Sequence, residues 1–125
     1  MNVEVVISDN FRKEAKKYLK KFPSLKKELN LLAESLVINP KQGVKLTETT
    51  YKIRLASKSK GKGKSGGFRV ITYIIETIEE EIETIVTLLS IYDKSEVVSL
   101  NNASISQIIN EFLTQKLDTN LDPNT

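Results

Sequence analysis

Residues 51–74 read YKIRLASKSKGKGKSGGFRVITYI, two β-type runs joined by a loop rich in glycine and lysine. In the first run apolar and polar residues alternate, which is the period of a strand, and Lys52 and Arg54 share one face. The second run, 68–75, is β-rich and apolar on both faces. The eleven residues between the runs, SKSKGKGKSGG, hold four lysines and four glycines and predict a mobile basic loop.

The residues before this stretch predict a strand and two helices. Residues 2–7 alternate as a strand does, and Ser8 offers an N-cap to an amphipathic helix over 11–22. Ser24 offers a second N-cap to a helix over 25–36, which is closely followed by an Asn-Pro pair that ends it. The two helices, joined by a short turn, form a helical hairpin.

The residues after this stretch predict a strand and a helix. Residues 84–92 predict a buried strand. This strand should pair antiparallel with the run at 68–75, across an acidic turn at 76–81. Ser104 is the expected N-cap of a last amphipathic helix, and 118–125 are expected to be a disordered tail.

The order β-α-α-β-β-β-α predicts an α+β fold. We expect a small, antiparallel-rich sheet of about four strands with an N-terminal helical hairpin and a C-terminal helix. The chain has 125 residues, of which 39% are apolar and 28% charged, so one domain over 1–117 is expected, with 41–50 as a connection.

Composition narrows the possible locations and chemistries. No apolar run approaches the roughly 20 residues of a spanning helix, and the N-terminus lacks a signal-peptide pattern, so a cytoplasmic protein without membrane contact is expected. The chain has no cysteine and no histidine, which excludes disulfides, thiolate nucleophiles, Cys/His zinc sites and imidazole catalysis. Its chemistry must use Lys, Arg, Tyr, Asp, Glu or a hydroxyl.

The net charge of +3 conceals two unequal halves. Residues 1–69 hold 17 of the 19 Lys and Arg but only 6 of the 16 Asp and Glu. This asymmetry suggests a surface that faces a polyanion.

Two groups of cations are candidates for binding RNA. Lysines spaced by two in a glycine-rich loop suit an irregular phosphate backbone, although a solvated loop is the alternative. The outer face of the first helix suits RNA as well, although a solvated helix face is nearly as plausible. The candidates are Lys58, Lys60, Lys62 and Lys64 in the loop, and Arg12, Lys16 and Lys20 on the helix.

A third group should converge at one end of the sheet. If the strands pair antiparallel in sequence order, Lys52 and Arg54 come close to Arg69, and Lys94 follows the neighbouring strand. Concentrated positive charge is costly without an anion, which favours a phosphate ligand. Each residue is alternatively a rim residue whose stem covers apolar surface.

The segment KIRLASKSKGKGKSGGFRV, followed by LLSIYDKSE at 88–96, resembles the RelE/ParE superfamily of toxins from type II toxin–antitoxin systems. The closest resemblance is to HigB-like and RelE-like members, and it extends from the first strand to the last helix. It implies a small antiparallel sheet with helices on one side.

The resemblance also implies a function. RelE-type toxins are ribosome-dependent endoribonucleases that cut translated mRNA without a metal or another cofactor. The expected partners are the ribosome, mRNA and a cognate antitoxin, here a HigA-like helix-turn-helix protein, with operator DNA bound only through the antitoxin.

By the same resemblance, the catalytic cations correspond to Lys52, Arg54, Arg69 and Lys94. The last is a lysine where the RelE pattern has an arginine. A tyrosine of the RelE pattern corresponds to Leu100, so Tyr92 or Tyr73 would have to replace it.

Metal-free cleavage needs a base for the 2′-hydroxyl, charge stabilisation for the phosphorane and an acid for the 5′-oxygen. Arg69 and Lys94 are the candidates for charge stabilisation. Lys52 is a candidate base if Arg54 and Arg69 lower its pKa by repulsion between like charges, and Tyr92 or Asp93 is the alternative.

Two other functions fit the same fold. ParE-like toxins inhibit DNA gyrase and do not cleave RNA. An inactive homologue would act only as an antitoxin partner and corepressor. The basic strands and the lysine loop favour the nuclease.

Overall fold

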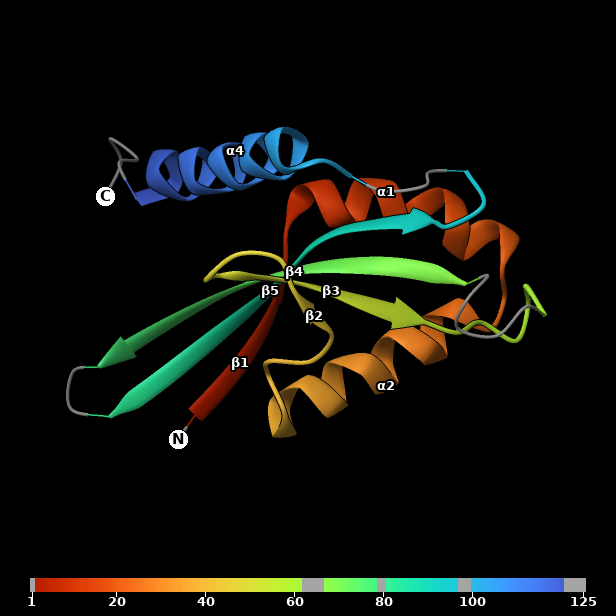
Figure 1. Cartoon of the computed structure of the whole chain (residues 1–125), viewed down its shortest axis with the longest axis horizontal. Helices are drawn as coiled ribbons and strands as arrows, with labels where there is room; N and C mark the ends of the chain where they lie inside the picture. Colours follow the sequence, from red (N-terminus) through yellow and green to blue (C-terminus); the bar gives the residue numbers. More distant parts are fainter. Residues whose placement is uncertain (1, 62–66, 79–80, 97–99, 121–125) are drawn as a thin grey trace.

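A five-stranded sheet with the strand order β1-β5-β4-β3-β2 forms the centre of the protein (Figure 1). The computed structural model describes residues 2–61, 67–78, 81–96 and 100–120. The strands are β1 (Asn2–Ile7), β2 (Val44–Lys45), β3 (Thr50–Leu55), β4 (Phe68–Ile78) and β5 (Ile82–Asp93). The helices are α1 (Asp9–Lys21), α2 (Leu25–Ile38) and α4 (Asn102–Asn120). The α+β class and the order of the main elements are therefore as the sequence predicts.

The sheet is mixed but mostly antiparallel. β3, β4 and β5 pair antiparallel in sequence order, as expected, whereas β1 pairs parallel with β5 at the far edge. β4 and β5 are longer than predicted because the pairing continues from Ile75 opposite Ile85 to Ile78 opposite Ile82. The acidic residues at this end therefore extend a hairpin, and residues 79–80 lie outside the described part.

A short fifth strand lies in the stretch that we expected to be only a connection. Val44 and Lys45 pair antiparallel with Lys52 and Tyr51 and form β2. Gly43 makes this approach possible, since it has a φ of 91° and a Cβ there would lie 2.2 Å from the carbonyl oxygen of Lys52. The prediction of an irregular connection is wrong at these two residues.

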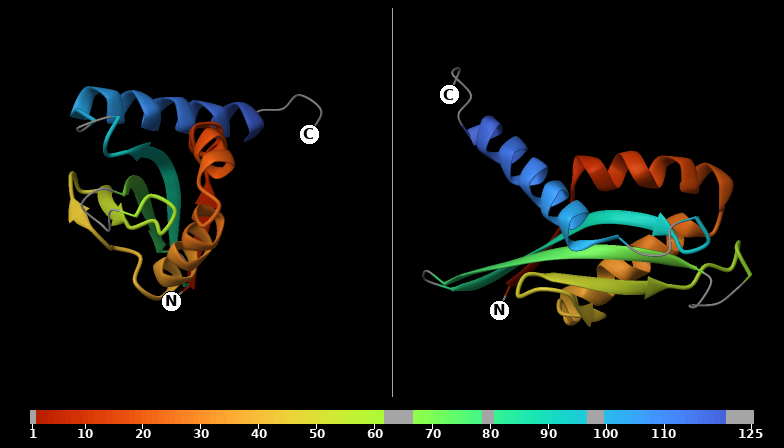
Figure 2. Two further views of the ribbon diagram at one scale, coloured as in Figure 1. Left: turned by 90° about the vertical axis from the view of Figure 1, so that its right-hand side faces the viewer. Right: turned by 45° about the horizontal axis from the view of Figure 1, so that its top comes forward.

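Both faces of the sheet are covered by helices. One face packs against α1 and α2, and its core includes Phe68, Val70 and Ile74 of β4; we call it the hairpin face. The opposite face packs against α4, with Ile71 and Tyr92 buried beneath it; we call it the site face. Figure 2 shows α4 lying over the strands on the side away from α2. The expectation of helices on one side only is therefore wrong, because the apolar stripe of α4 covers the second apolar face of β4 and β5.

The helix ends show which capping predictions hold. Ser8 caps α1 as predicted, its hydroxyl accepting a hydrogen bond from the backbone of Phe11 at 3.0 Å. Ser24 occupies the N-cap position of α2 without a side-chain capping bond. Asn101 rather than Ser104 caps α4, because its side-chain oxygen accepts the N–H of Ser104 at 2.8 Å.

The last helix also continues beyond its expected end. We predicted that the domain stops at 117, but α4 reaches Asn120, and only 121–125 of the expected tail lie outside the described residues. Across the described ranges, none of the helices has the length and apolarity to cross a bilayer.

Gly43 provides a test of this fold. Gly43→Ala should lower the free energy of unfolding by at least about 2 kcal/mol, because the new Cβ overlaps the Lys52 carbonyl and φ is positive. Gly61→Ala is the matched control: φ is 69° and no atom lies within 4 Å of the new Cβ, so a loss of about 1 kcal/mol is expected. Urea unfolding measures both variants, and equal losses would contradict the close approach of β2 to β3.

Candidate active site

The register of the three central strands places Arg54, Arg69 and Tyr92 side by side. Arg54 of β3 lies opposite Arg69 of β4, which lies opposite Tyr92 of β5. Residues directly opposite one another project from the same face of a sheet. These three residues, which we call the arginine row, therefore share the site face, and Lys52 lies on the same face two residues along β3 from Arg54.

The cations of the site face differ in their access to solvent. Arg54 is exposed and Lys52 is half-buried, whereas Arg69 is only 5% exposed. The Arg69 guanidinium donates a hydrogen bond to the carbonyl of Phe68 at 3.2 Å. Two guanidinium groups directly opposite on a sheet repel, and a phosphate bound beside them would reduce this repulsion. An anion arriving from solvent would contact Arg54 and Lys52 first, while the buried Arg69 would attract it from beneath them.

Tyr92 is the tyrosine that the structure places beside the arginines. Burial raises the pKa of Tyr92, and the charge of Arg69 and a hydrogen bond with the Leu100 backbone offset only part of this effect. The phenol is therefore protonated at neutral pH and suits the role of a proton donor better than that of a base. Leu100, where the resemblance places a tyrosine, packs against the same cluster as Tyr92.

Tyr73, the other candidate to replace that tyrosine, lies farther from the arginines. It pairs with Thr50 and Thr87, so three pairs of the β3–β4 ladder separate it from Arg69 along the strand. Its ring packs edge-to-face on Phe112 of α4, with 6.4 Å between the ring centroids. Tyr73 therefore contributes to packing beneath α4.

A β-bulge in β5 brings Tyr92 to the site face. Ile71 lies opposite Ser90 and Thr72 lies opposite Leu88, so Leu89 is one residue more than the ladder requires. Without this extra residue Ile91 would lie opposite Arg69, and Tyr92 would project from the hairpin face.

The backbone groups at the bulge are bonded to side chains of α1 and its cap. The carbonyl of Leu89 accepts hydrogen bonds from Ser8 at 3.1 Å and from Asn10 at 3.0 Å. The carboxylate of Glu14 accepts the hydroxyl of Ser90 at 2.8 Å and the N–H of Ile91 at 3.3 Å. At the bulge some polar groups have no partner within the sheet. The bonds from α1 and its cap satisfy these groups and so stabilise the bulge.

Asp93 does not belong to the site face. It lies opposite Phe68 and projects toward α1 and α2, where its carboxylate forms a buried ion pair with Lys60 at 2.5 Å. The ammonium of Lys60 also lies 5.3 Å from the ring centroids of Phe22 and Phe68. The structure therefore places Asp93, the predicted alternative base, away from the arginine row, and it places Lys60, a predicted RNA contact, in a buried ion pair.

Several hydrogen-bond donors stabilise the ionised form of Asp93. Burial on its own raises the pKa of the carboxyl, but hydrogen bonds from Lys60 and Ser95 outweigh burial and hold the pKa below its usual value. Ser95 donates both its backbone N–H, at 2.9 Å, and its hydroxyl, at 2.7 Å.

The first part of the lysine loop, residues 57–61, is hydrogen-bonded to the N-terminal part of α2. The backbone N–H of Lys58 donates to the carboxylate of Glu28 at 2.8 Å, and the hydroxyls of Ser24 and Ser59 are hydrogen-bonded at 2.7 Å. Lys58 itself is exposed and remains a candidate RNA contact. Lys62 and Lys64 lie outside the described residues.

The remaining candidates are Lys94, which follows β5, and three cations of α1. The N–H of Lys94 donates to the carbonyl of Gly67 at 3.1 Å, so Lys94 stays beside the start of β4, where it is half-buried. Arg12, Lys16 and Lys20 are exposed on α1, which packs on the hairpin face. The structure does not bring these three cations to the arginine row, and they form a separate basic surface.

No protein-family model matches the chain. Within the described ranges, no three His, Cys, Asp or Glu side chains are grouped so that they could hold a metal ion. The arginine row itself consists of two guanidinium groups and a protonated phenol.

The buried ion pair predicts a non-additive effect of mutation. Lys60→Met should lower the free energy of unfolding by about 3–5 kcal/mol, because it leaves the Asp93 carboxylate buried without its cation. Lys60→Met/Asp93→Asn should cost less than Lys60→Met alone, since the amide is neutral and still accepts bonds from Ser95. Urea unfolding at pH 7 of both variants and of Asp93→Asn completes the cycle, and a loss in the double variant equal to the sum of the two single losses would contradict the buried pair.

The pH dependence of stability has a definite sign. The pKa of Asp93 is lower in the folded than in the unfolded state, so its contribution is present above the unfolded value of about 3.9 and is lost as the pH falls through the folded value. The stability difference between wild type and Asp93→Asn should therefore be largest near pH 7 and shrink below about pH 4. A difference that is constant between pH 7 and pH 3 would contradict this account.

Proposed function

We propose that this protein is the toxin of a type II toxin–antitoxin pair, a ribosome-dependent endoribonuclease that cleaves translated mRNA. The observation that best supports the proposal is the arginine row, with Lys52 beside it on the same face. The resemblance of residues 52–70 to RelE-like and HigB-like toxins points to the same activity. The high positive charge of the first half of the chain is consistent with a target made of RNA.

The proposed reaction uses the RNA's own 2′-hydroxyl as the nucleophile. The 2′-oxygen attacks phosphorus while its proton is removed, the bond to the 5′-oxygen breaks, and that oxygen takes up a proton. The products are a 2′,3′-cyclic phosphate and a 5′-hydroxyl. Lys52 and Arg54 are accessible to the phosphate, and Arg69 adds positive charge beneath them, which stabilises the phosphorane.

The site face offers few groups for the two proton transfers. Tyr92 is the proposed acid because its phenol is protonated at neutral pH. The hydrogen bond from the Leu100 backbone lowers the pKa of Tyr92, so the phenol oxygen accepts this bond and the phenol proton stays available for the leaving oxygen. Lys52 is the proposed base, since Asp93 lies on the other face. A site with so few proton-transfer groups should depend on the ribosome to position the mRNA.

The proposed partners follow from this function. A cognate antitoxin, in our proposal a HigA-like helix-turn-helix protein, would neutralise the toxin and carry it to operator DNA. The exposed cations of α1 and Lys58 are proposed to contact ribosomal RNA. The proposed place of action is the cytoplasm, where translated mRNA is found.

One observation favours a second candidate function. Arg69 and Tyr92 are 5% and 3% exposed, so neither offers much surface to RNA in this structure. A ParE-like toxin that inhibits gyrase, or an inactive homologue, would not need them exposed. Expression of the wild type and of site variants separates the nuclease, the gyrase inhibitor and the inactive homologue.

Expression of the wild type should arrest growth and produce defined cuts in translated mRNA, mapped by primer extension. Arg54→Ala should lower cleavage about 10²-fold or more, because it removes a cation that faces the developing charge. Arg69→Ala and Lys94→Ala should lower cleavage as well.

Lys116→Ala is the matched control, because Lys116 is an exposed cation on α4 outside the arginine row, and it should keep full cleavage. Equal growth arrest by wild type and all variants without mRNA cuts would reject the nuclease. Induction of the DNA-damage response would then indicate the gyrase inhibitor, and no growth arrest at all would indicate an inactive homologue.

Tyr92→Phe tests the proposed acid separately. The ring, which is 3% exposed, stays in the core, and the variant loses only the hydroxyl and its hydrogen bond with the Leu100 backbone, so the thermal midpoint should fall by only a few degrees. Cleavage should fall about 10²-fold if the phenol protonates the leaving oxygen. Full cleavage by a folded Tyr92→Phe protein would remove Tyr92 from the mechanism.

A further inference from the structure

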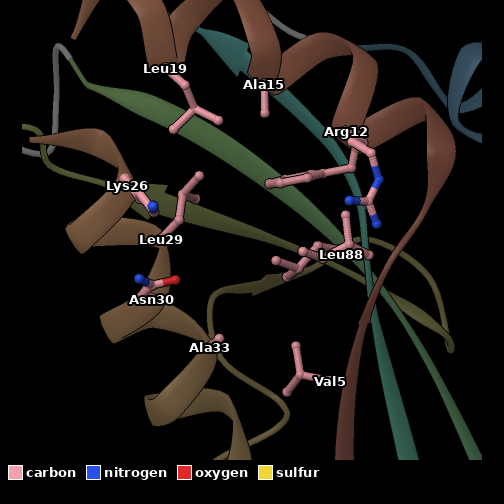
Figure 3. Close-up of a pocket in the computed structure, with 11 residues that line it drawn as sticks. Val5, Arg12, Ala15, Leu19, Lys26, Leu29, Asn30, Ala33 and Leu88 are labelled. Carbon is pink, nitrogen blue, oxygen red and sulfur yellow. The ribbon is translucent and has the colours of Figure 1, made fainter. Parts of the chain in front are cut away.

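A groove of about 270 Å³ lies between α1 and α2 (Figure 3). Its floor is apolar and includes Val5 of β1, Phe11 of α1 and Leu88 of β5. It opens on the hairpin face, so it shares no residue with the arginine row. The groove is therefore a separate feature of the protein.

Small residues on the two helices keep this groove open. Ala15 of α1 and Ala33 of α2 face it, and Leu19 and Leu29 extend its walls (Figure 3). Two of the lining residues are large, apolar and exposed: Leu19 is 40% exposed and Ile7 is 46% exposed. Large apolar side chains left to water along an open groove are typical of a surface that a partner covers.

The rim of the groove is positively charged. Arg12 stands on the α1 side, and Lys26 stands on the α2 side beside Asn30 (Figure 3). Among the residues that the structure describes, none of those lining the groove is acidic. The solvent face of α1 adds further cations next to it, namely Lys13, Lys16, Lys17, Lys20 and Lys21.

We propose that this groove binds an acidic amphipathic helix of a partner protein. Two or three apolar residues, spaced i, i+3 or i+4 and i+7, would insert between Leu19 and Leu29, and Asp or Glu at the edges would pair with Arg12 and Lys26. An apolar trough between two helices suits a third helix, because helices pack against one another along such ridges and grooves. This inference goes beyond the proposed nuclease function and does not depend on it.

Charge separates this occupant from the alternatives. A second copy of the chain would bring its own basic α1 face against the same basic rim, which is repulsive. RNA would match the rim but not the apolar floor. An acidic amphipathic helix matches both the floor and the rim.

A peptide selection tests the proposal directly. The full chain is immobilised, and a display library of random 18-residue peptides is selected for binding. The enriched sequences should carry the i, i+3/i+4, i+7 apolar spacing with an excess of Asp and Glu. Their affinities are then measured by fluorescence anisotropy against the wild type and three variants.

Each variant changes one property of the groove. Ala33→Leu fills it and Lys26→Glu reverses the charge of its rim, and each should weaken binding at least tenfold. Lys27→Glu is the matched control, because Lys27 is exposed on the same helix but does not line the groove, and it should bind as the wild type does. Thermal unfolding confirms that each variant is folded.

Three results would overturn the proposal. The first is a selection that yields no binders, or binders without the apolar and acidic pattern. The second is equal affinity of the selected peptides for the wild type and a folded Ala33→Leu. The third is a dimer, detected by sedimentation, that Ala33→Leu abolishes, which would make a second copy the occupant. Since mRNA cleavage is not a readout, none of these results bears on the nuclease.

Discussion

One extra residue in β5 decides which side chains meet on the site face. The bulge at Leu89 shifts the pairing by one position, so that Tyr92 rather than Ile91 lies opposite Arg69. The same shift turns Asp93 to the hairpin face. The bulge is stabilised by α1 and its cap, because Ser8 and Asn10 donate to the Leu89 carbonyl and Glu14 accepts from Ser90 and Ile91. The first helix therefore fixes the composition of a site on the opposite face of the sheet.

The two faces of the sheet carry different properties. The site face combines accessible cations with a buried arginine and a protonated phenol, which suits the stabilisation of a phosphorane. On the hairpin face the buried charges stabilise the fold, because Lys60 and Asp93 form an ion pair next to two aromatic rings. It also leaves an apolar groove open between its helices. A partner seated in that groove would leave the arginine row uncovered.

Much of the fold follows from periodicity, because strand alternation and helical spacing are local properties. The same alternation correctly put Lys52 and Arg54 on one face, and antiparallel pairing brought Arg69 beside them. The face of Asp93 was not predictable in this way, because a period of two assumes an unbroken ladder and a bulge leaves no local mark in the sequence. The role of Lys60 was missed for a related reason: its partner is 33 residues away, and a lysine in a glycine-rich loop looks solvated.

The central claim is that the site face promotes attack by the RNA's own 2′-hydroxyl, and one substitution in the substrate tests it most directly. A synthetic mRNA is bound to purified ribosomes and treated with the protein in the presence of EDTA at a level that leaves the ribosomes intact. The account predicts a cut with a 2′,3′-cyclic phosphate end, and no cut at that position when the single nucleotide before it is 2′-deoxy. Cleavage of the 2′-deoxy substrate, or no cleavage of the all-ribose mRNA on the ribosome, would contradict it.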